Sequence, residues 1–394
     1  MEGGQEHPSR SAPDRIRVLY VDHTPIMGGA QISLLELVQT LDRSRFDVAV
    51  ACTDRCPAVM RGIEDAGGDA LVVRVPRLRG NPLTLPVRCA AGISDLVGAC
   101  REFRPDVVHS NSARTHVYGL VAARISGAKS VWTLRDMEFP RAFFRRLVGF
   151  TAGVICVSGA VRDHYDPGHR FAGVHLIPNG ILVPPLDVPH ERSRVRAELG
   201  IAEDVPVAGS VGRMLPWKGQ DRFLLAAASV LRELPDARFV LLGNPDQPDY
   251  LRGLEELADT NGIGERAVFG GFREDIIPSI TAFDLLCHTS LAPEPFGRVL
   301  VEAMAVGVPV IASPTGGPLD IIEHEVSGLL VDPQDTSLLA ESMIRLLTDR
   351  TLRERLSRSA RSAFETKFDQ ARETASVEAV YESVMMCGRG DRCG

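Results

Sequence analysis

The sequence lacks three features that would mark other classes of protein. No apolar run reaches the ~18 residues that a membrane-spanning helix needs. The opening stretch, MEGGQEHPSRSAPDR, has no apolar segment of the kind found in export signals. The formal net charge is −7, so the basic excess of a nucleic-acid-binding protein is missing. We therefore expect a cytoplasmic protein that binds no nucleic acid.

What the sequence does contain is a globular composition and a repeating α/β pattern. Hydrophobic residues make up 44% of the chain and charged residues 24%, and 394 residues are too many for one core. A helical pattern over Gln31–Leu41 follows the first strand-like run, and helical stretches separate most of the later runs. The strand-like runs of the first half are 16–22, 46–52, 70–75, 106–110, 130–134 and 153–158. Such alternation predicts a parallel sheet with helices on both faces.

A proline-rich segment interrupts this pattern and divides the chain. Residues 176–191 contain Pro178, Pro184, Pro185 and Pro189, so we predict a linker there. Strand-like runs then resume at 206–212, 238–243, 267–271, 283–288 and 308–313. The chain is therefore predicted to form two doubly wound, Rossmann-like α/β domains that face each other across a cleft. Ligands would bind at the carboxyl ends of the strands.

The domain boundaries follow from this break and from the helical pattern of the last part of the chain. We predict a disordered lead over 1–14, a first domain over 15–182, a second over 183–368, a final helix over 369–387 and a tail over 388–394. The final helix is expected to cross back to the first domain. Packing on its own domain is the alternative, and the pattern alone does not decide between the two.

The most informative segment is PEPFGRVLVEAMAVGVPVIAS, residues 293–313. Val299–Val306 has helical spacing, and Gly297 just before it lets a ligand come close to the backbone. The free N–H groups of such a helix start suit a diphosphate. Glu302 would then accept hydrogen bonds from a ribose, and Glu294 would face a sugar. A loop carboxylate and a solvated helical glutamate are the alternative interpretation.

Two cations and a glycine pair add to this pattern. Arg213 and Lys218 follow the strand at 206–212, where they could hold phosphate oxygens; ordinary surface cations are the alternative. Gly28 and Gly29 follow the first strand and would let the backbone approach a phosphate. They do not form G-x-G-x-x-G, so a NAD-dependent dehydrogenase is not indicated.

Together these segments resemble glycosyltransferase family 4, a group of retaining, nucleotide-sugar-dependent enzymes with the GT-B fold. The resemblance runs from about Ile16 to Tyr381 and is most specific in EPFGRVLVEAMAVGVPVIAS. The segments VGRMLPWKG, IPNGI, GGFRED, FDLLCHTS and SGLLVDPQD support it. The resemblance implies a hexosyltransferase that moves a sugar from a UDP- or GDP-sugar to a hydroxyl of a small-molecule or lipid-linked acceptor, without a metal or another cofactor.

The resemblance also implies roles for individual residues. The candidate catalytic residues are Glu294, Arg213, Lys218 and Arg135. The donor site would comprise Gly29, Arg213, Lys218, Phe272, Arg273, Glu294, Phe296, Gly297, Arg298, Val299 and Glu302. The acceptor side would comprise His23, Thr24, Asn111, Asp136 and Glu138. Carboxylates on that side would suit a cationic acceptor such as an amino sugar or aminocyclitol, so bacterial glycan, glycolipid and natural-product biosynthesis all stay open.

One position departs from the family. Many members have a histidine in a pattern like Thr-x-His-Asp, whereas WTLRDME places Arg135 there, before Asp136. Three interpretations stay open. Arg135 takes over the work of the histidine as a permanent cation; or His109, in DVVHSNS, is a structural residue; or the sugar pocket has changed, and the choice of donor with it.

The segment FPRAFFRRLVGF, residues 139–150, combines aromatic residues with Arg141, Arg145 and Arg146. A packed helix with a solvated edge is one interpretation. The other is peripheral contact with the inner face of the membrane, which the resemblance to enzymes with lipid-linked acceptors suggests.

Two further functions fit a pair of α/β domains. One is a sugar-nucleotide epimerase of the same fold, and the other is a non-catalytic, two-lobed sugar-binding protein. Incubation with a nucleotide-sugar alone separates epimerisation, which needs no acceptor, from transfer. The sequence gives no indication of the oligomeric state.

Overall fold

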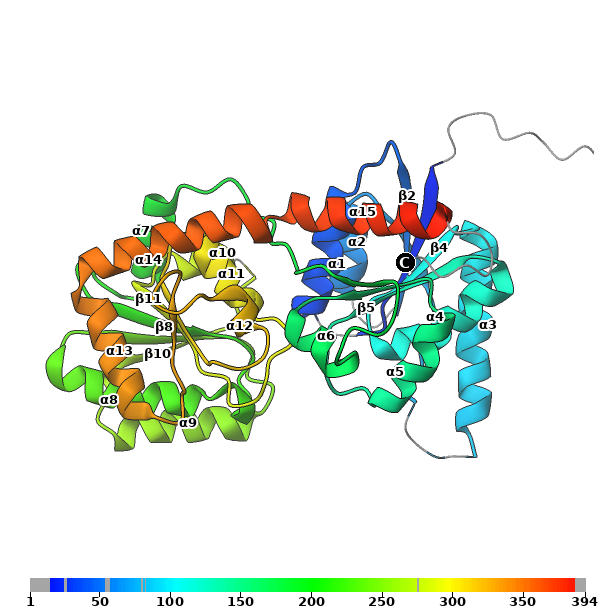
Figure 1. Cartoon of the computed structure of the whole chain (residues 1–394). Coiled ribbons are helices and arrows are strands. Elements are labelled where there is room, and N and C mark those ends of the chain that lie inside the picture. Colours follow the sequence, from blue (N-terminus) through cyan, green and yellow to red (C-terminus); the bar gives the residue numbers. More distant parts are fainter. Residues whose placement is uncertain are drawn as a thin grey trace, which may run out of the picture. The chain divides into compact units, whose positions relative to one another are not determined.

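The structure is a computed structural model that describes residues 15–386 apart from 25–26, 54–56, 79–80, 82 and 275. The predicted lead over 1–14 and tail over 388–394 lie outside these residues. The chain folds into two compact units, whose elements are labelled in Figure 1. Unit 1 takes in the described residues up to Cys156, then Tyr165–Ile177, and the described chain from Thr374 on. Unit 2 takes in Val157–His164 and Pro178–Glu373.

Unit 1 is built on a seven-stranded parallel sheet with the order β3-β2-β1-β4-β5-β6-β7. Its strands are β1 (Ile16–Val21), β2 (Phe46–Cys52), β3 (Asp69–Val72), β4 (Val107–Ser110), β5 (Lys129–Leu134), β6 (Gly153–Cys156) and β7 (Val174–Leu176). The order reverses between β1 and β4. In open α/β sheets, ligands bind at the carboxyl ends of strands that flank such a reversal.

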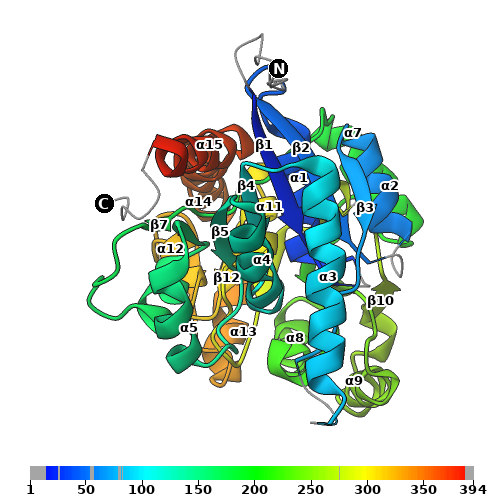
Figure 2. The same ribbon diagram turned by 90° about the vertical axis from the view of Figure 1, so that its right-hand side faces the viewer.

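Helices cover both faces of this sheet, as the buried, apolar strands require. α1 (Gly29–Thr40) and α2 (Pro57–Asp65) share a core with one face, and α3 (Leu85–Phe103) and α4 (Ala113–Ser126) share a core with the other. Figure 2 shows α3 and α4 lying side by side. The short elements α5 (Arg141–Leu147) and η1 (Val148–Phe150) follow β5. The helix after β6, α6 (Gly159–Tyr165), belongs to unit 2 except for its last residue.

The C-terminal helix α15 (Gln370–Met386) contributes to the core of unit 1. Its buried side chains there are Val377, Val380, Tyr381 and Val384. At its start, the hydroxyls of Thr374 and Thr40 lie 2.6 Å apart. Further along, Arg45 Nη1 donates to Glu378 Oε2 at 2.8 Å. Apolar and polar contacts together therefore hold α15 against the face that carries α1.

A buried hydrogen-bond chain links α15 to the sheet. The hydroxyl of Tyr381 lies 2.6 Å from the hydroxyl of Tyr20 and 2.5 Å from Nδ1 of His109. His109 Nε2 lies 2.6 Å from Thr133 Oγ1. Burial, with a smaller contribution from the charge of Arg135, lowers the pKa of His109 to about 3. The ring is therefore neutral near pH 7, and His109 connects β4, β5 and α15 as a structural residue.

Unit 2 contains a six-stranded sheet with the order β10-β9-β8-β11-β12-β13, whose paired strands are parallel. The strands are β8 (Val207–Val211), β9 (Arg238–Leu242), β10 (Ala267–Gly271), β11 (Leu285–His288), β12 (Val310–Ala312) and β13 (Leu329–Leu330). This sheet reverses its order between β8 and β11. The two doubly wound sheets confirm the predicted fold class.

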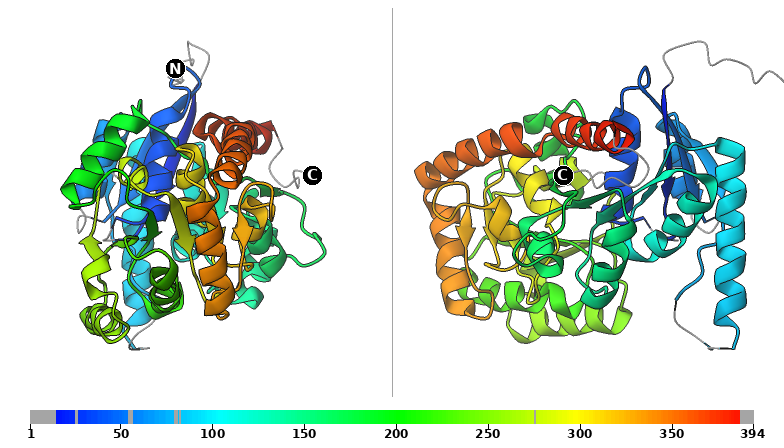
Figure 3. Two further views of the ribbon diagram at one scale, coloured as in Figure 1. Left: turned by 90° about the vertical axis from the view of Figure 1, so that its left-hand side faces the viewer. Right: turned by 45° about the vertical axis from the view of Figure 1, so that its right-hand side comes forward.

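The helices of unit 2 also lie on both sides of its sheet. They are α7 (Val188–Glu198), α8 (Gln220–Glu233), α9 (Pro248–Thr260), α10 (Ile276–Ile280), α11 (Arg298–Ala305), α12 (Pro318–Ile321), α13 (Thr336–Thr348) and α14 (Arg350–Ala363). Short turns of helix occur at η2 (Pro216–Lys218), η3 (Gly264–Arg266) and η4 (Phe364–Phe368). Figure 3 shows α8 and α9 side by side, and α13 packs against α8.

The predicted linker over 176–191 is shorter than expected. Leu176 still belongs to β7, and α7 begins at Val188. Pro189 lies in the first turn of α7, where a missing N–H breaks no helical hydrogen bond. Asp187 Oδ1 accepts a hydrogen bond from the backbone N–H of His190 at 3.2 Å and caps the helix. The prolines therefore mark a helix start as well as an irregular segment.

Across the parts of the chain that the structure describes, no helix is both long enough and apolar enough to cross a lipid bilayer.

Candidate functional site

Two neighbouring strands bring predicted donor residues of unit 2 together. β8 and β11 pair in the middle of the sheet, so the segments that leave their carboxyl ends are neighbours. Lys218 follows β8 and Glu294 follows β11, and Lys218 Nζ donates to Glu294 Oε1 at 2.7 Å. Only 14% and 15% of the two side chains are exposed, so the ion pair is largely shielded from water.

Glu294 has two further hydrogen-bond partners, and both contact its second carboxylate oxygen, Oε2. His288, the last residue of β11, forms a hydrogen bond from Nε2 to Glu294 Oε2, and Ser290 Oγ donates to that oxygen at 3.1 Å. Burial alone would raise the pKa of Glu294, but Lys218 and His288 outweigh it and hold the pKa well below its usual value. Because an ionised carboxylate only accepts, Nε2 of His288 carries the proton. Glu294 is thus a fixed acceptor for hydroxyl groups at neutral pH.

Backbone contacts hold the two segments at a fixed spacing. Thr289 Oγ1 donates to the carbonyl oxygens of Lys218 at 3.1 Å and Gly219 at 2.8 Å. The N–H of Leu291 donates to the carbonyl of Trp217 at 2.8 Å. Gly219 has a φ of +66°, and a Cβ there would lie 2.1 Å from the carbonyl oxygen of Thr289. Only glycine allows this approach, which keeps Lys218 beside the end of β11.

A second glycine pair supports the turn that carries Glu294. The N–H of Gly317 donates to the carbonyl of Glu294 at 2.7 Å, and Gly316 forms a β-bridge with Glu294. A Cβ on Gly316 would lie 2.4 Å from the carbonyl oxygen of Glu294. A Cβ on Gly317 would lie equally close, at 2.4 Å, to the carbonyl oxygen of Phe296. Side chains at these two positions would therefore displace the turn.

The start of α11 contains five of the predicted donor residues. Gly297 is left-handed, with φ 103° and ψ 53°, and immediately precedes the helix. Phe296 is 4% exposed and its ring packs edge to face on Phe368, so the ring is not accessible to a ligand. Arg298 Nη2 lies 3.3 Å from Glu302 Oε1, one turn into the helix, and Val299 next to Arg298 is half-buried. The five predicted donor residues therefore lie together at the start of α11.

Arg213 lies at the end of β8 and forms an ion pair from Nε to Asp246, which follows the neighbouring strand β9. Its side chain is 60% exposed, and its carbonyl accepts from Gln220 Nε2 at 3.0 Å. Both predicted cations of unit 2 therefore lie at the carboxyl edge of the sheet, each beside a carboxylate. Among the described residues, no group of three or more His, Cys, Asp or Glu side chains is arranged to hold a metal ion.

The structure does not bring Phe272 and Arg273 to this cluster. Both follow β10, the edge strand, which is separated from β8 by β9. Phe272 is 58% exposed. Arg273 Nη1 donates to Glu198 Oε2 of α7 at 2.7 Å, so its charge is directed to that helix. A base-binding role for the two residues stays a prediction.

The other predicted residues belong to unit 1 and lie at the carboxyl ends of β1, β4 and β5. Gly29 is the first residue of α1. Arg135 follows β5 and donates from Nε to Asn111 Oδ1 at 2.8 Å. Asn111 is 2% exposed and donates in turn from Nδ2 to Asp22 Oδ2 at 2.8 Å. The N–H of Thr24 donates to Asp22 Oδ1 at 2.8 Å.

The remaining acceptor-side residues differ in charge. Burial, followed by the charge of Arg114, lowers the pKa of His23 to about 4, so this ring is neutral near pH 7. Burial raises the pKa of Asp136, whose Oδ1 accepts from the N–H of Glu138 at 3.2 Å and from the hydroxyl of Tyr165 at 3.4 Å. Glu138 is exposed. An acceptor role for these residues stays a prediction.

The sequence reasoning missed His288, Ser290, Gly316 and Gly317. His288 and Ser290 stand in FDLLCHTS, but their meeting with Glu294 depends on the turn that brings the chain back toward the end of β11. The glycine pair was recognisable, because it follows strand β12 as Gly28 and Gly29 follow β1. That repetition was the available signal.

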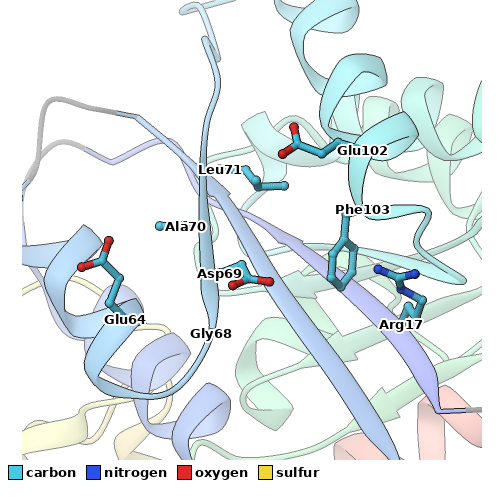
Figure 4. A pocket seen from close by; sticks show the side chains of 8 residues that line it. All are labelled: Arg17, Glu64, Gly68, Asp69, Ala70, Leu71, Glu102 and Phe103. Carbon is cyan, nitrogen blue, oxygen red and sulfur yellow. The ribbon is translucent and has the colours of Figure 1, made fainter.

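A surface hollow of about 480 Å³ lies elsewhere, at the amino-terminal ends of strands in unit 1 (Figure 4). Arg17 is the second residue of β1 and Asp69 the first of β3, so the hollow lies at the opposite edge of the sheet from the predicted residues. It is lined by Arg17, Glu64, Gly68, Asp69, Ala70, Leu71, Glu102 and Phe103. None of these belongs to the predicted site.

Replacing Lys218 by alanine should lower the free energy of unfolding of unit 2 by ~3 kcal/mol near pH 7, because a shielded carboxylate loses its cation. In Lys218→Ala, the folded-state pKa of Glu294 is higher than in the wild type because the lowering by Lys218 is lost, so the loss shrinks as the pH falls and the carboxyl group of the variant takes up a proton. Urea unfolding at several pH values measures this. Arg252→Ala, which breaks an exposed ion pair with Asp249, serves as the control and should change little. A loss that is the same at pH 4 and pH 7 would contradict the electrostatic explanation.

The chain is similar to known proteins over most of its length. The family model described as Glycosyltransferase Family 4 matches residues 27–182, and Glycosyl transferases group 1 matches residues 191–363. An uncharacterized glycosyltransferase of Methanocaldococcus jannaschii is 32% identical over 220 residues, which is 54% of this chain and 55% of that protein. The match therefore spans about half the length of that relative.

Two longer matches cover nearly the whole fold. The GDP-mannose-dependent alpha-(1-6)-phosphatidylinositol monomannoside mannosyltransferase of Mycobacterium tuberculosis is 29% identical over 356 residues, 85% of this chain and 90% of that protein. The crystal structure of HepE of Anabaena in complex with UDP-glucose is 27% identical, with a TM-score of 0.79, and covers 94% of this chain and 100% of that one. With its two doubly wound units, this chain belongs to the glycosyltransferases of family 4 type with the GT-B fold.

Proposed function

We propose that the protein is a metal-independent, retaining glycosyltransferase that moves a sugar from a UDP- or GDP-sugar to a hydroxyl group of an acceptor. The observation that carries this proposal is the ionised Glu294, held by Lys218 beside the start of α11. The similar HepE was solved with UDP-glucose, and the similar mycobacterial enzyme is GDP-mannose-dependent. Both support a nucleoside-diphosphate sugar as the donor.

The proposed donor lies along the carboxyl edge of unit 2. Its diphosphate takes the place of Asp246 as the partner of Arg213 and receives the charge of Lys218 as well. The N–H groups at the start of α11 add partial positive charge. Glu302 accepts from the ribose, and Glu294 accepts from the hydroxyls of the sugar. Each part of the donor thus meets a group of matching chemistry.

The proposed reaction is a front-face substitution. The acceptor oxygen forms a bond to the anomeric carbon on the side from which the diphosphate leaves, and the bond from that carbon to the phosphate oxygen breaks. The electron pair stays with the diphosphate, where Arg213 and Lys218 stabilise it. The acceptor proton passes to a phosphate oxygen. The step depends on positioning and charge, so no protein nucleophile is required.

The acceptor is proposed to bind at the carboxyl ends of the unit 1 strands, near His23, Thr24, Asp136 and Glu138. A small molecule, including an amino sugar or aminocyclitol, and a lipid-linked sugar both fit this proposal. Glycan, glycolipid and natural-product biosynthesis are therefore the candidate pathways, and the cytoplasm is the proposed location.

Peripheral membrane contact is proposed for a patch that we call the α5 patch: Phe143, Phe150, Arg124, Arg141, Arg145 and Arg146. Phe143 is 50% and Phe150 61% exposed, whereas Phe144 between them is fully buried in unit 1. Arg124 lies over the ring of Phe150, 5.2 Å from its centroid. Exposed aromatic rings among arginines suit the interface of an anionic membrane.

Flotation with vesicles tests the α5 patch. The protein should float with vesicles of phosphatidylglycerol and phosphatidylcholine at low salt, and less so with phosphatidylcholine alone. The double variant Phe143→Ser, Phe150→Ser should stay at the bottom, because it removes the apolar anchors and keeps the charge. Phe272→Ser, an equally exposed ring in unit 2, is the matched control. Protein that stays at the bottom in every case removes membrane contact from the proposal.

A thermal-shift panel of nucleotide-sugars tests the donor. At least one UDP- or GDP-sugar should raise the melting temperature, because it binds only the folded state. Arg213→Ala should then weaken binding of the corresponding nucleoside diphosphate about tenfold, which is the order expected for loss of one charge-assisted contact. Arg252→Ala, an exposed arginine of α9, should bind as the wild type does. A panel without any shift would contradict the proposed function.

A further inference from the structure

The two oxygens of the Glu294 carboxylate have partners of different kinds. Lys218 Nζ donates to Oε1 at 2.7 Å, and its charge lies at the end of a flexible four-carbon chain. His288 Nε2 and Ser290 Oγ both donate to Oε2. His288 is the last residue of β11 and Ser290 follows two residues later, so both donors lie at the end of this strand. Oε1 is therefore held by a cation that can move, and Oε2 by donors that stay in place.

The position of His288 is fixed by the sheet of unit 2. His288 pairs with Ala312 of β12, and its carbonyl accepts from the N–H of Ser313 at 3.0 Å and from Ser313 Oγ at 3.1 Å. Its side chain is 3% exposed. Among the described residues, Nδ1 of the ring has no hydrogen-bond partner. The orientation of the ring is therefore set at Nε2, by Glu294 and by Ser290 Oγ at 3.2 Å.

The charge of Glu294 depends on few groups. The titratable side chains that the described structure places in contact with its carboxylate are Lys218 from η2 and His288 from β11. The segment before α12 meets this turn through the backbone of Gly316 and Gly317, which adds no charge. Burial opposes ionisation of Glu294, and the two partners outweigh it. If a ligand takes the charge of Lys218, ionisation depends on the donors that remain at Oε2.

We propose that His288 is a positioning residue, which keeps Glu294 ionised and directed at the sugar after the diphosphate has drawn Lys218 away. This inference rests on the proposed function, in which the diphosphate receives the charge of Lys218 and the sugar hydroxyls donate to Glu294. Once Lys218 turns to the phosphates, Oε1 is open to the sugar, while His288 and Ser290 still hold Oε2. Hydrogen bonds to the ionised form favour that form in a shielded site.

Two variants at position 288 form a matched pair. In His288→Gln, the amide nitrogen reaches the place of Nε2 and still donates to Glu294. In His288→Asn, which is one methylene shorter, the amide lies near the place of Nδ1 and does not reach the carboxylate. Both variants put a neutral amide at the same buried position, so a difference between them reports the donor at Oε2. His324→Leu, which removes the acceptor of the Leu330 N–H, is the control.

The first readout is the dissociation constant, relative to the wild type, of the nucleotide-sugar identified in the thermal-shift panel and of its nucleoside diphosphate. At pH 5.5, His288→Asn should bind the nucleotide-sugar about tenfold more weakly, because the shielded carboxyl group takes up a proton and loses its charge. The loss should shrink toward pH 8.5, where the group ionises. Binding of the nucleoside diphosphate should not weaken at either pH. His288→Gln and His324→Leu should stay close to the wild type.

The second readout is the infrared difference spectrum of donor binding at pH 5.5, in which a protonated carboxyl group has a C=O stretching band that an ionised one lacks. Binding should produce this band in His288→Asn and not in the wild type. Its loss in His288→Asn combined with Glu294→Gln assigns it to Glu294.

Three results would overturn the inference. The first is a Glu294 carboxyl band in the wild type on donor binding, which needs no variant to fold. The second is an equal loss of nucleotide-sugar affinity in His288→Asn and His288→Gln without pH dependence, which makes His288 a merely structural residue. The third is wild-type affinity and pH dependence in His288→Asn. If the wild type binds no nucleotide-sugar at all, the proposed function fails and the inference fails with it.

Discussion

A carboxylate shielded from water stays ionised only where positive charge lies beside it, and this constraint organises the carboxyl edge of unit 2. Glu294 is held between Lys218 and His288. Lys218 follows strand β8, and His288 is the last residue of the neighbouring strand β11. The backbone of Gly219 packs closely against the carbonyl of Thr289, which keeps the two segments in contact. A side chain at position 219 would push them apart. An acceptor of fixed charge and direction results, next to a helix start that favours anions. Under the proposed function, the carboxylate meets the hydroxyls of the sugar and the helix start meets the diphosphate.

The two units hold their cations in different ways. In unit 2, Lys218 and Arg213 each lie beside a carboxylate, so their charges are balanced until an anion arrives. In unit 1, Arg135 is held by the neutral amide of Asn111, and the carboxylate of Asp22 lies one residue further along the row. Under the proposed function, a cation that is balanced by a carboxylate can exchange that partner for a phosphate oxygen when the donor binds.

Much of the fold could be predicted from the sequence, because buried parallel strands are short apolar runs that are easy to recognise. The short strands β7 and β13 were missed, because so few residues show no pattern that separates a strand from a loop. The start of α7 at Val188 was missed because the prolines around it suggested a linker. Lys218 and Glu294 could be singled out by residue type, but their contact depends on the strand order, which a sequence does not display. The same holds for Asn111, whose polarity suggested a ligand contact. The register of β1 and β4 places it beside Asp22, and its amide nitrogen donates a hydrogen bond to that carboxylate.

The most direct measurement of the central interaction is calorimetric titration of the wild type and of Glu294→Gln with two ligands, an intact nucleotide-sugar and the matching nucleoside diphosphate. If Glu294 faces the sugar while Lys218 and Arg213 hold the phosphates, Glu294→Gln should weaken binding of the nucleotide-sugar relative to the nucleoside diphosphate about tenfold or more. Binding of the nucleoside diphosphate itself should not weaken, because Lys218 loses the carboxylate that competes with the phosphates. An equal change for both ligands, or no change for either, would show that the sugar does not lie against Glu294.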